Sequence, residues 1–315
     1  MKILSIGNFS NASWDGSIPD EEHIAKALED LGHTVDRWQR EQTGPGGMFG
    51  TSGEMPPKYD FILIAQWDGY PEDFRSVLKR VSDYPIVYWA FDYQADGQEW
   101  HERLVNEADV YLSKPLSDMR KHKNWRFLSQ DFAPEFLDKA TDINVGGDKD
   151  IDVLFTGSWV PWESGKERVK YLKAIDERFN LQINSVTPAQ WKAEGFKNVE
   201  GPVMDHDLPA LIARAKINIS MDHVWSPGYW SDRNAQIMCC GGFVLFRHVP
   251  LSEAVFKEKV AYFHTIDECL EKIDYYLKNP EERERIAERG YKCAVKHMKV
   301  GSRVKELLTI LGEFL

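Results

Sequence analysis

The chain has 315 residues, which suggests two domains of ordinary size. Its residues are 43% hydrophobic, 28% charged and 12% aromatic, enough apolar content for sizeable cores, so a disordered chain is excluded. The formal net charge of −11 at pH 7 disfavours a protein-wide electrostatic attraction to nucleic acid or to anionic membranes. No apolar run approaches the roughly 20 residues that span a membrane.

The N-terminus and the cysteines indicate a reducing compartment. Residues 1–7 are a short apolar run that stops at Gly7, which predicts a buried first strand rather than a signal peptide. The four cysteines include one adjacent pair and show neither CxxC nor Cys/His metal spacing. We therefore expect reduced thiols, no structural zinc and a cytoplasmic protein.

The N-terminal half alternates strands and helices. Near-continuous apolar runs at 61–65 and 86–90 are typical of strands buried on both faces, which favours a parallel sheet. Residues 42–57 are rich in Gly and Pro and predict a loop. The further elements expected in this half are strands 2–7, 34–38 and 108–112 and a helix 20–31 that Gly32 ends.

The C-terminal half repeats the same alternation after a polar, Gly-containing stretch at 141–150, which we interpret as a linker. Its expected strands are 151–156, 181–185, 217–220 and 243–246, and its expected helices are 165–178, 207–215, 231–240, 266–278, 280–297 and one from about 301 to the end. The sequence thus predicts an α/β protein of two Rossmann-like, doubly wound domains facing a cleft, 1–147 and 148–315. The last helix is expected to be able to pack back on the N-terminal domain.

The segment 152–159 could carry chemistry because a strand ends there in Gly157-Ser158. Ligands of open α/β sheets bind at the carboxyl ends of the strands, and free backbone N–H groups there favour anions. Lys166 and Arg168 follow in the next helix and could reach a diphosphate. A plain strand-to-helix turn with surface cations is the alternative.

A second candidate is the polar and aromatic segment 220–236, where a strand runs into a loop and then a helix. Ser231 is interpreted as the N-cap of that helix, and Asp232, Arg233 and Gln236 lie in its first turns. The alternative is a capped helix with Arg233 in a surface salt bridge.

The expected strands of the N-terminal half end in acidic and aromatic residues. Asp15 is a candidate general base or acceptor-positioning group, and turn aspartates or helix caps are the alternative interpretation. The acceptor-side candidates that accompany it are Trp14, Gly16, Trp67, Asp68 and Asp92. A basic stretch at 120–126 is interpreted as a solvated surface or, alternatively, as an acceptor or nucleic-acid contact.

Several catalytic signatures are absent from the sequence. It contains no GxGxxG, no GxxxxGK[ST] and no GxSxG, which removes support for a dinucleotide oxidoreductase, a P-loop NTPase and an α/β-hydrolase. It also contains no paired DxD in a loop where a divalent metal would be expected, and none of its nine histidines forms an HxxxH pair, so no metal is implied.

Over about half of its length the chain resembles GT-B glycosyltransferases of the spore-maturation (CgeB-like) group, within the group 1-like glycosyl transferases. The segments that carry this resemblance, in the order and spacing of that family, are DVLFTGSW (152–159), GFKNVEGP (195–202), SDRNAQIMCCGGFVL (231–245) and NPEERERIAERG (279–290). The resemblance of the N-terminal half to the family is only general in character.

The resemblance implies a donor site in the C-terminal domain and an acceptor site in the N-terminal one. It places Gly157, Ser158 and Trp159 under a diphosphate. The negative charge of this diphosphate would be balanced by Arg168 and Arg233. The resemblance places Asn198 and Val199 beside the nucleobase, and Ser231, Asp232 and Gln236 at the ribose and phosphate. The family usually has a glutamate where this chain has Gln236, so a charge-assisted bond to a donor hydroxyl is lost.

We therefore expect a metal-independent glycosyltransferase without a cofactor, whose co-substrate is a nucleoside-diphosphate sugar, most readily a UDP-sugar. Arg233 would stabilise the leaving group and Asp15 would be the base of an inverting reaction. The acceptor is unidentified: a glycan, a protein, a small molecule or modified DNA. The alternatives are a phage-type glycosyltransferase of hydroxymethylated DNA bases, a non-catalytic sugar-nucleotide-binding or structural protein on the same scaffold, and a sugar-nucleotide epimerase.

Overall fold

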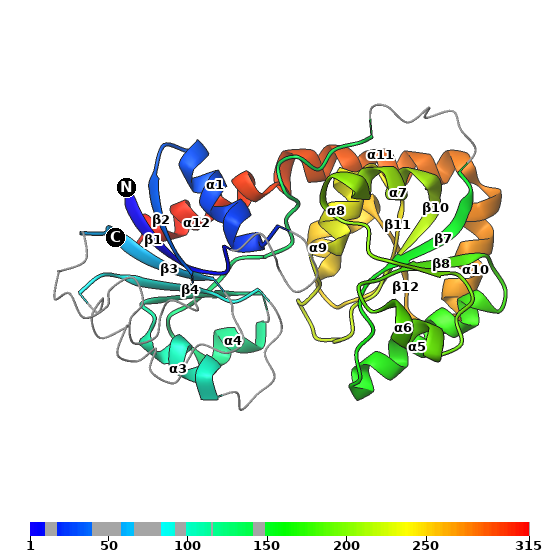
Figure 1. Ribbon diagram of the computed structural model, residues 1–315, viewed down its shortest axis with the longest axis horizontal. Helices are drawn as coiled ribbons and strands as arrows, with labels where there is room; N and C mark the ends of the chain where they lie inside the picture. The colour runs from blue at the N-terminus through cyan, green and yellow to red at the C-terminus, as the bar shows by residue number, and fades with distance from the viewer. Residues whose placement is uncertain are drawn as a thin grey trace. The chain divides into compact units, whose positions relative to one another are not determined.

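The computed structural model describes residues 1–9, 18–39, 58–65, 83–91, 99–114, 116–140 and 149–314 (Figure 1). The chain divides into two compact units. The N-terminal unit comprises residues 1–130 and 300–315, and the C-terminal unit comprises residues 131–299. Each unit is described by itself below.

The N-terminal unit contains a six-stranded parallel sheet in the order β2-β1-β3-β4-β5-β6. The order reverses direction between β1 and β3, which makes the carboxyl ends of these two strands the switch point of the sheet. The strands are β1 (Lys2–Gly7), β2 (Thr34–Gln39), β3 (Phe61–Ala65), β4 (Ile86–Trp89), β5 (Val110–Ser113) and β6 (Trp125–Phe127).

Helices cover both faces of this sheet (Figure 1). The described helices are α1 (Asp20–Asp30), α3 (Glu99–Glu107), α4 (Leu116–Lys121) and, from the end of the chain, α12 (Val300–Leu311). Helix α12 packs against α1. Gly32 has φ +85°, the left-handed conformation expected of the glycine that ends α1.

The C-terminal unit contains a second six-stranded parallel sheet, in the order β12-β11-β10-β7-β8-β9. Numbered within the unit this is the Rossmann order 3-2-1-4-5-6, whose switch point lies between the carboxyl ends of β7 and β10. The strands are β7 (Ile151–Thr156), β8 (Leu181–Asn184), β9 (Val199–Glu200), β10 (Ala215–Ser220), β11 (Val244–Arg247) and β12 (Ala261–Phe263).

Each face of this second sheet has its own hydrophobic core. One core packs α5, α6 and α10 against residues such as Val153 and Phe155, and the other packs α7, α8 and α9 against Leu154 and Phe246. The described helices are α5 (Glu163–Asp176), α6 (Pro188–Ala193), α7 (Leu208–Arg214), α8 (Arg233–Cys239), α9 (Ser252–Phe256), α10 (Ile266–Lys278) and α11 (Pro280–His297), with 3-10 turns η2 (Asp205–Asp207) and η3 (Lys257–Lys259). The predicted α/β class, with two doubly wound parallel sheets, is confirmed.

Residues 131–140 belong to the C-terminal unit, whereas the sequence analysis drew the boundary at 147/148. Their packing explains the difference. The Trp230 indole N–H donates to Asp131 (2.8 Å), and the buried Lys299 ammonium donates to the carbonyls of Pro134 (3.3 Å), Glu135 (3.0 Å) and Leu137. The predicted linker at 141–150 lies mostly outside the described residues.

The cysteines agree with the expectation of reduced thiols, since none of the four is in a disulfide. Among the described helices, none has the length and apolarity that crossing a membrane requires.

Candidate functional site

The switch point of the C-terminal sheet brings together the segments that follow β7 and β10. The two strands are parallel neighbours, with Phe155 opposite Ile219. Gly157-Ser158 continues from one strand, and Met221-Asp222 continues from the other. Ligands of open α/β sheets bind at this place, so the sequence candidates of the two segments lie at one site.

Arg233 joins the two strand ends. It is the first residue of α8, and its Nε donates to the carbonyl of Thr156 (2.8 Å). Its Nη1 donates to Asp222 Oδ1 (3.2 Å) and to Ser231 Oγ (3.1 Å). The Asp222 side chain is only 5% exposed and also accepts the backbone N–H of Ser231 (3.2 Å). The guanidinium is therefore fixed by both strands and is not in the surface salt bridge weighed as the alternative.

Gly157 leaves room for that guanidinium. A Cβ at this position would lie 3.1 Å from Arg233 Nη2 and 2.9 Å from the Phe155 ring, tighter than side chains ordinarily approach. Because the arginine passes directly over the turn, glycine is the residue that fits.

Arg168 is the second cation of the site. Its side chain projects from α5, is 3% exposed and donates from Nη1 to the carbonyl of Ser158 (3.0 Å). Its Nε has no hydrogen-bond partner among the described residues. Both guanidiniums lie over the Phe155 ring, at 5.5 Å for Arg168 and 5.6 Å for Arg233. Burial, and then the charge of Arg233, lowers the pKa of Arg168 to about 9, so it remains a cation at neutral pH.

The charges of the site favour an anionic ligand. Two buried or half-buried guanidiniums face one buried carboxylate, that of Asp222, so positive charge is in excess. The planar guanidinium of arginine binds phosphate oxygens through two or more hydrogen bonds. In a site without water these hydrogen bonds are stronger than in bulk water. The arrangement can hold a diphosphate and stabilise charge that develops on it.

The start of α8 differs from the sequence prediction. The helix begins at Arg233 with Asp232 as its N-cap residue, so the N-cap assigned to Ser231 is wrong by one residue. The physical reason is that the Ser231 hydroxyl is bonded by Arg233. Gln236 donates its side-chain amide to the carboxylate of Asp232, one turn earlier. A carboxylate therefore stands beside the residue that replaces the family's glutamate.

The β8–β9 side of the site is built mainly from backbone and structural contacts. The amide of Trp159 donates to Thr187 Oγ1 (2.7 Å), and its indole donates to Glu194 (3.1 Å). The Asn198 carbonyl accepts from Ile183 N (3.0 Å). The Val199 side chain is 4% exposed and belongs to the hydrophobic core, so only its backbone can border a ligand.

Sequence reasoning did not assign roles to Asp222, His223 or Phe155. Asp222 and His223 follow the end of β10 after one intervening residue, so the same carboxyl-end rule that selected Gly157 would have found them. Phe155 is an apolar residue of a buried strand, and no sequence signal distinguishes it from the core.

The N-terminal candidates Trp14, Asp15, Gly16, Trp67, Asp68 and Asp92 lie outside the described residues. What is described at that switch point is acidic. Helix α1 opens with Asp20, Glu21 and Glu22, and the 6% exposed Glu21 accepts the N–H of Asn8 (3.2 Å), directly after β1.

The basic stretch 120–126 lies at the opposite edge of its sheet from this switch point. It includes the end of α4 and the start of β6, and β6 runs parallel to β5. Residues before β6 therefore lie at the amino edge. Arg120 and Lys123 are exposed there. Their position does not support the acceptor contact weighed as an alternative.

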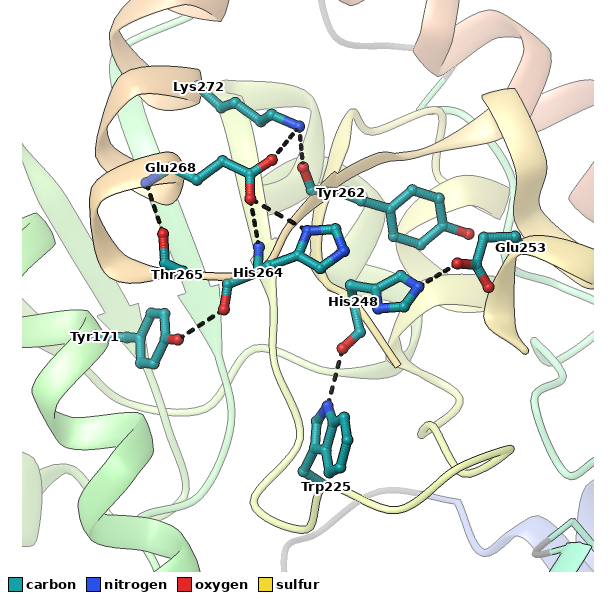
Figure 2. Close-up of polar contacts among 9 residues, drawn as sticks. All are labelled: Tyr171, Trp225, His248, Glu253, Tyr262, His264, Thr265, Glu268 and Lys272. Carbon is teal, nitrogen blue, oxygen red and sulfur yellow. Dashed lines mark hydrogen bonds and ion pairs between the residues drawn. The ribbon is translucent and has the colours of Figure 1, made fainter. Parts of the chain in front are cut away.

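A further polar cluster follows β11 and β12 (Figure 2). The His248 and His264 rings stack with centroids 4.4 Å apart. His248 contacts Glu253, and His264 Nδ1 lies 3.2 Å from Glu268, which also pairs with Lys272 (2.8 Å). The His248 carbonyl accepts the indole N–H of Trp225 (3.0 Å), which ties this cluster to the segment 221–232.

No group of three or more His, Cys, Asp or Glu side chains suited to holding a metal ion occurs among the described residues. The Figure 2 cluster consists of hydrogen bonds, ring contacts and the ion pair between Lys272 and Glu268.

Comparison with known proteins gives a family for the C-terminal half. Residues 166–309 match the family described as glycosyl transferase-like. No curated protein sequence is significantly similar to this chain.

Solved structures with the same fold extend over the whole chain. Anabaena Alr3699/HepE, solved with UDP and glucose, has a TM-score of 0.68 at 15% identity, covering 100% of both chains. Sucrose-phosphate synthase (tll1590) from Thermosynechococcus elongatus has a TM-score of 0.70 at 11% identity, covering 99% of this chain and 98% of that one. T4 phage BGT, solved with its UDP-glucose substrate, has a TM-score of 0.64 at 14% identity, covering 99% of both.

The family match and the shared fold identify the chain as a glycosyltransferase of the GT-B fold, as the sequence predicted. The narrower resemblance to the spore-maturation group stays a prediction.

Proposed function

We propose that the chain transfers a sugar from a UDP-sugar to an acceptor hydroxyl without a metal ion or cofactor. The observation that carries this proposal is the pair Arg168 and Arg233 over the Phe155 ring, beside Gly157 at the β7/β10 switch point. Two fixed cations can take the role that a divalent ion would have at a diphosphate. UDP or UDP-glucose in solved proteins of this fold supports uridine as the base.

The reaction separates charge. The bond between the anomeric carbon and the β-phosphate oxygen breaks, its electron pair stays on the diphosphate, and the acceptor oxygen bonds to the anomeric carbon. Arg168 and Arg233 stabilise the leaving diphosphate, which gains a negative charge in this step. The acceptor's proton must go to a base, for which we propose Asp15.

The Asp232–Gln236 pair is proposed to bind the ribose. The side-chain amide N–H of Gln236 donates to the Asp232 carboxylate. The side-chain carbonyl of Gln236 can then accept a further hydrogen bond. Asp232 then supplies the negative charge that the family's glutamate supplies, one helical turn earlier. This arrangement favours an active enzyme over a non-catalytic scaffold.

The donor is tested by isothermal titration of UDP-, GDP-, TDP- and CDP-sugars in the presence of EDTA. We expect UDP-sugars to bind, and Arg233→Ala to lose that binding and turnover. Absence of binding by every member of the panel, or EDTA-sensitive turnover, would contradict the proposal. Asp15→Asn should abolish turnover while leaving donor affinity within about twofold, because the proposed base acts on the acceptor proton and not on donor binding.

A further inference from the structure

His223 adjoins Asp222, the carboxylate that pairs with Arg233, and has no role in the function proposed above. It follows Asp222 in the segment after β10, and its side chain is half-buried. The Trp162 ring lies against it, with ring centroids 5.9 Å apart and the planes tilted by 36°. Trp162 itself is 60% exposed, so it shields the imidazole from the solvent side.

The charged groups around His223 come from three segments. Asp222 adjoins it in the chain and pairs with Arg233 at the start of α8, and the charge of Arg168 on α5 also acts on it. Burial, followed by the charge of Arg168, lowers the pKa of His223 to about 4, whereas Asp222 acts in the opposite direction. The imidazole is therefore neutral at pH 7 in the protein alone.

A bound donor changes this balance. The two guanidiniums and the Asp222 carboxylate together leave one positive charge. Each phosphate of a nucleotide sugar's diphosphate carries one negative charge, so the occupied site would be left with one negative charge. One additional proton on His223 brings the sum to zero, and an imidazolium offers two N–H donors.

We propose that His223 is a third ligand of the donor's diphosphate and binds it as an imidazolium, so that the donor enters the site together with one proton. This inference rests on the proposed function. The proton comes from the solvent: an N–H bond forms on the imidazole, an O–H bond of hydronium breaks, and water is left. When the sugar departs, the diphosphate gains a further negative charge, so the imidazolium holds the leaving group more strongly than the substrate and lowers the barrier.

Proton uptake tests the inference directly. UDP-glucose is titrated into the protein at pH 5.5 in buffers of different ionisation enthalpy, and the slope of observed enthalpy against ionisation enthalpy gives the protons bound. UDP-glucose is the suitable probe because both of its phosphates are diesterified and do not titrate near this pH. An anion beside a histidine raises its pKa by about 1–3 units, so we expect roughly 0.2–0.9 proton per donor.

Two variants assign the proton. His223→Asn should reduce the uptake to near zero and weaken donor binding more at pH 5.5 than at pH 8. His264→Asn, in the Figure 2 cluster outside the diphosphate site, should keep the wild-type uptake. Binding of UDP-glucose without uptake, or uptake that survives His223→Asn, overturns the inference and leaves the proposed function standing. If no nucleotide sugar binds, the proposed function fails and this inference with it.

Discussion

Among the described residues, the switch points of the two sheets are built alike but carry opposite charge. In each unit a glycine lies at the carboxyl end of the first strand, as the last residue of β1 or the residue after β7, and the side chain of a helix residue lies directly over it. Over Gly7 lies Glu21, whose Cγ would be 2.6 Å from an added Cβ, and over Gly157 lies Arg233. Glu21 already occupies the N–H of Asn8 with its own carboxylate. On these side chains we expect the C-terminal edge to attract a diphosphate and the described part of the N-terminal edge to repel it, so that side chains rather than topology decide what each edge binds.

Removal of Arg233 should have the largest effect on this contrast. Arg233→Ala takes away the cation that both strand ends fix, and we expect kcat/KM for the donor to fall by about 10²–10³-fold. Steady-state kinetics with UDP-glucose measure it. The control is Arg214→Ala, which removes only an exposed pair with Asp150 and should leave kcat/KM unchanged. Equal losses in the two variants would contradict the assignment.

The two glycines allow a matched pair of substitutions. Gly157→Ala should displace Arg233 and weaken donor binding by roughly tenfold, since overpacking costs about 1–3 kcal/mol. In Gly7→Ala the added methyl group would clash with Glu21 instead. Thermal unfolding should then show a loss of stability similar to that of Gly157→Ala, while donor affinity stays unchanged. If Gly7→Ala weakens donor binding as much as Gly157→Ala does, the two edges do not differ as described.

The Asp232–Gln236 pair makes a smaller and less intuitive prediction. Gln236→Glu restores the family's residue but sets two carboxylates against each other, so donor affinity should fall by about 1 kcal/mol, or roughly fivefold. The double variant Asp232→Asn/Gln236→Glu exchanges the two groups and should recover most of the loss in a titration with UDP-glucose. A gain in affinity from Gln236→Glu alone would show that Asp232 does not supply the missing charge.

The smallest effect is expected at the amino edge of the N-terminal sheet. Arg120→Ala/Lys123→Ala should change kcat/KM by less than about twofold, and turnover should respond only weakly to salt. A steep fall of turnover with salt that this variant removes would instead support a nucleic-acid acceptor.

Long, periodic helices and short apolar strands such as 61–65 and 151–156 were predictable from the sequence, whereas several other short elements were not. Helices 266–278 and 280–297 match α10 and α11 to the residue, because several turns of apolar periodicity and Pro280 fix their ends. Strands β9 and β12 and helices α6 and α9 escaped prediction, because two to six residues are too few to show a period.

The site was predictable from strand ends and from the helix starts that follow them. Gly157 follows from the strand-end rule, which Asp222 and His223 also obey, and Arg233 was selected at the start of a helix. The burial of Arg168 under Ser158 and against Phe155 depends on α5 packing across the sheet, which spacing along the chain does not encode. Val199 was expected beside the nucleobase, but the alternation of a strand turns its side chain into the core.

A crystal structure of the protein with bound UDP tests the central claim most directly. The account predicts the diphosphate at the carboxyl ends of β7 and β10, within hydrogen-bonding distance of both Arg168 and Arg233. Density for the diphosphate at the carboxyl ends of β1 and β3, or at any place away from these two arginines, would contradict it.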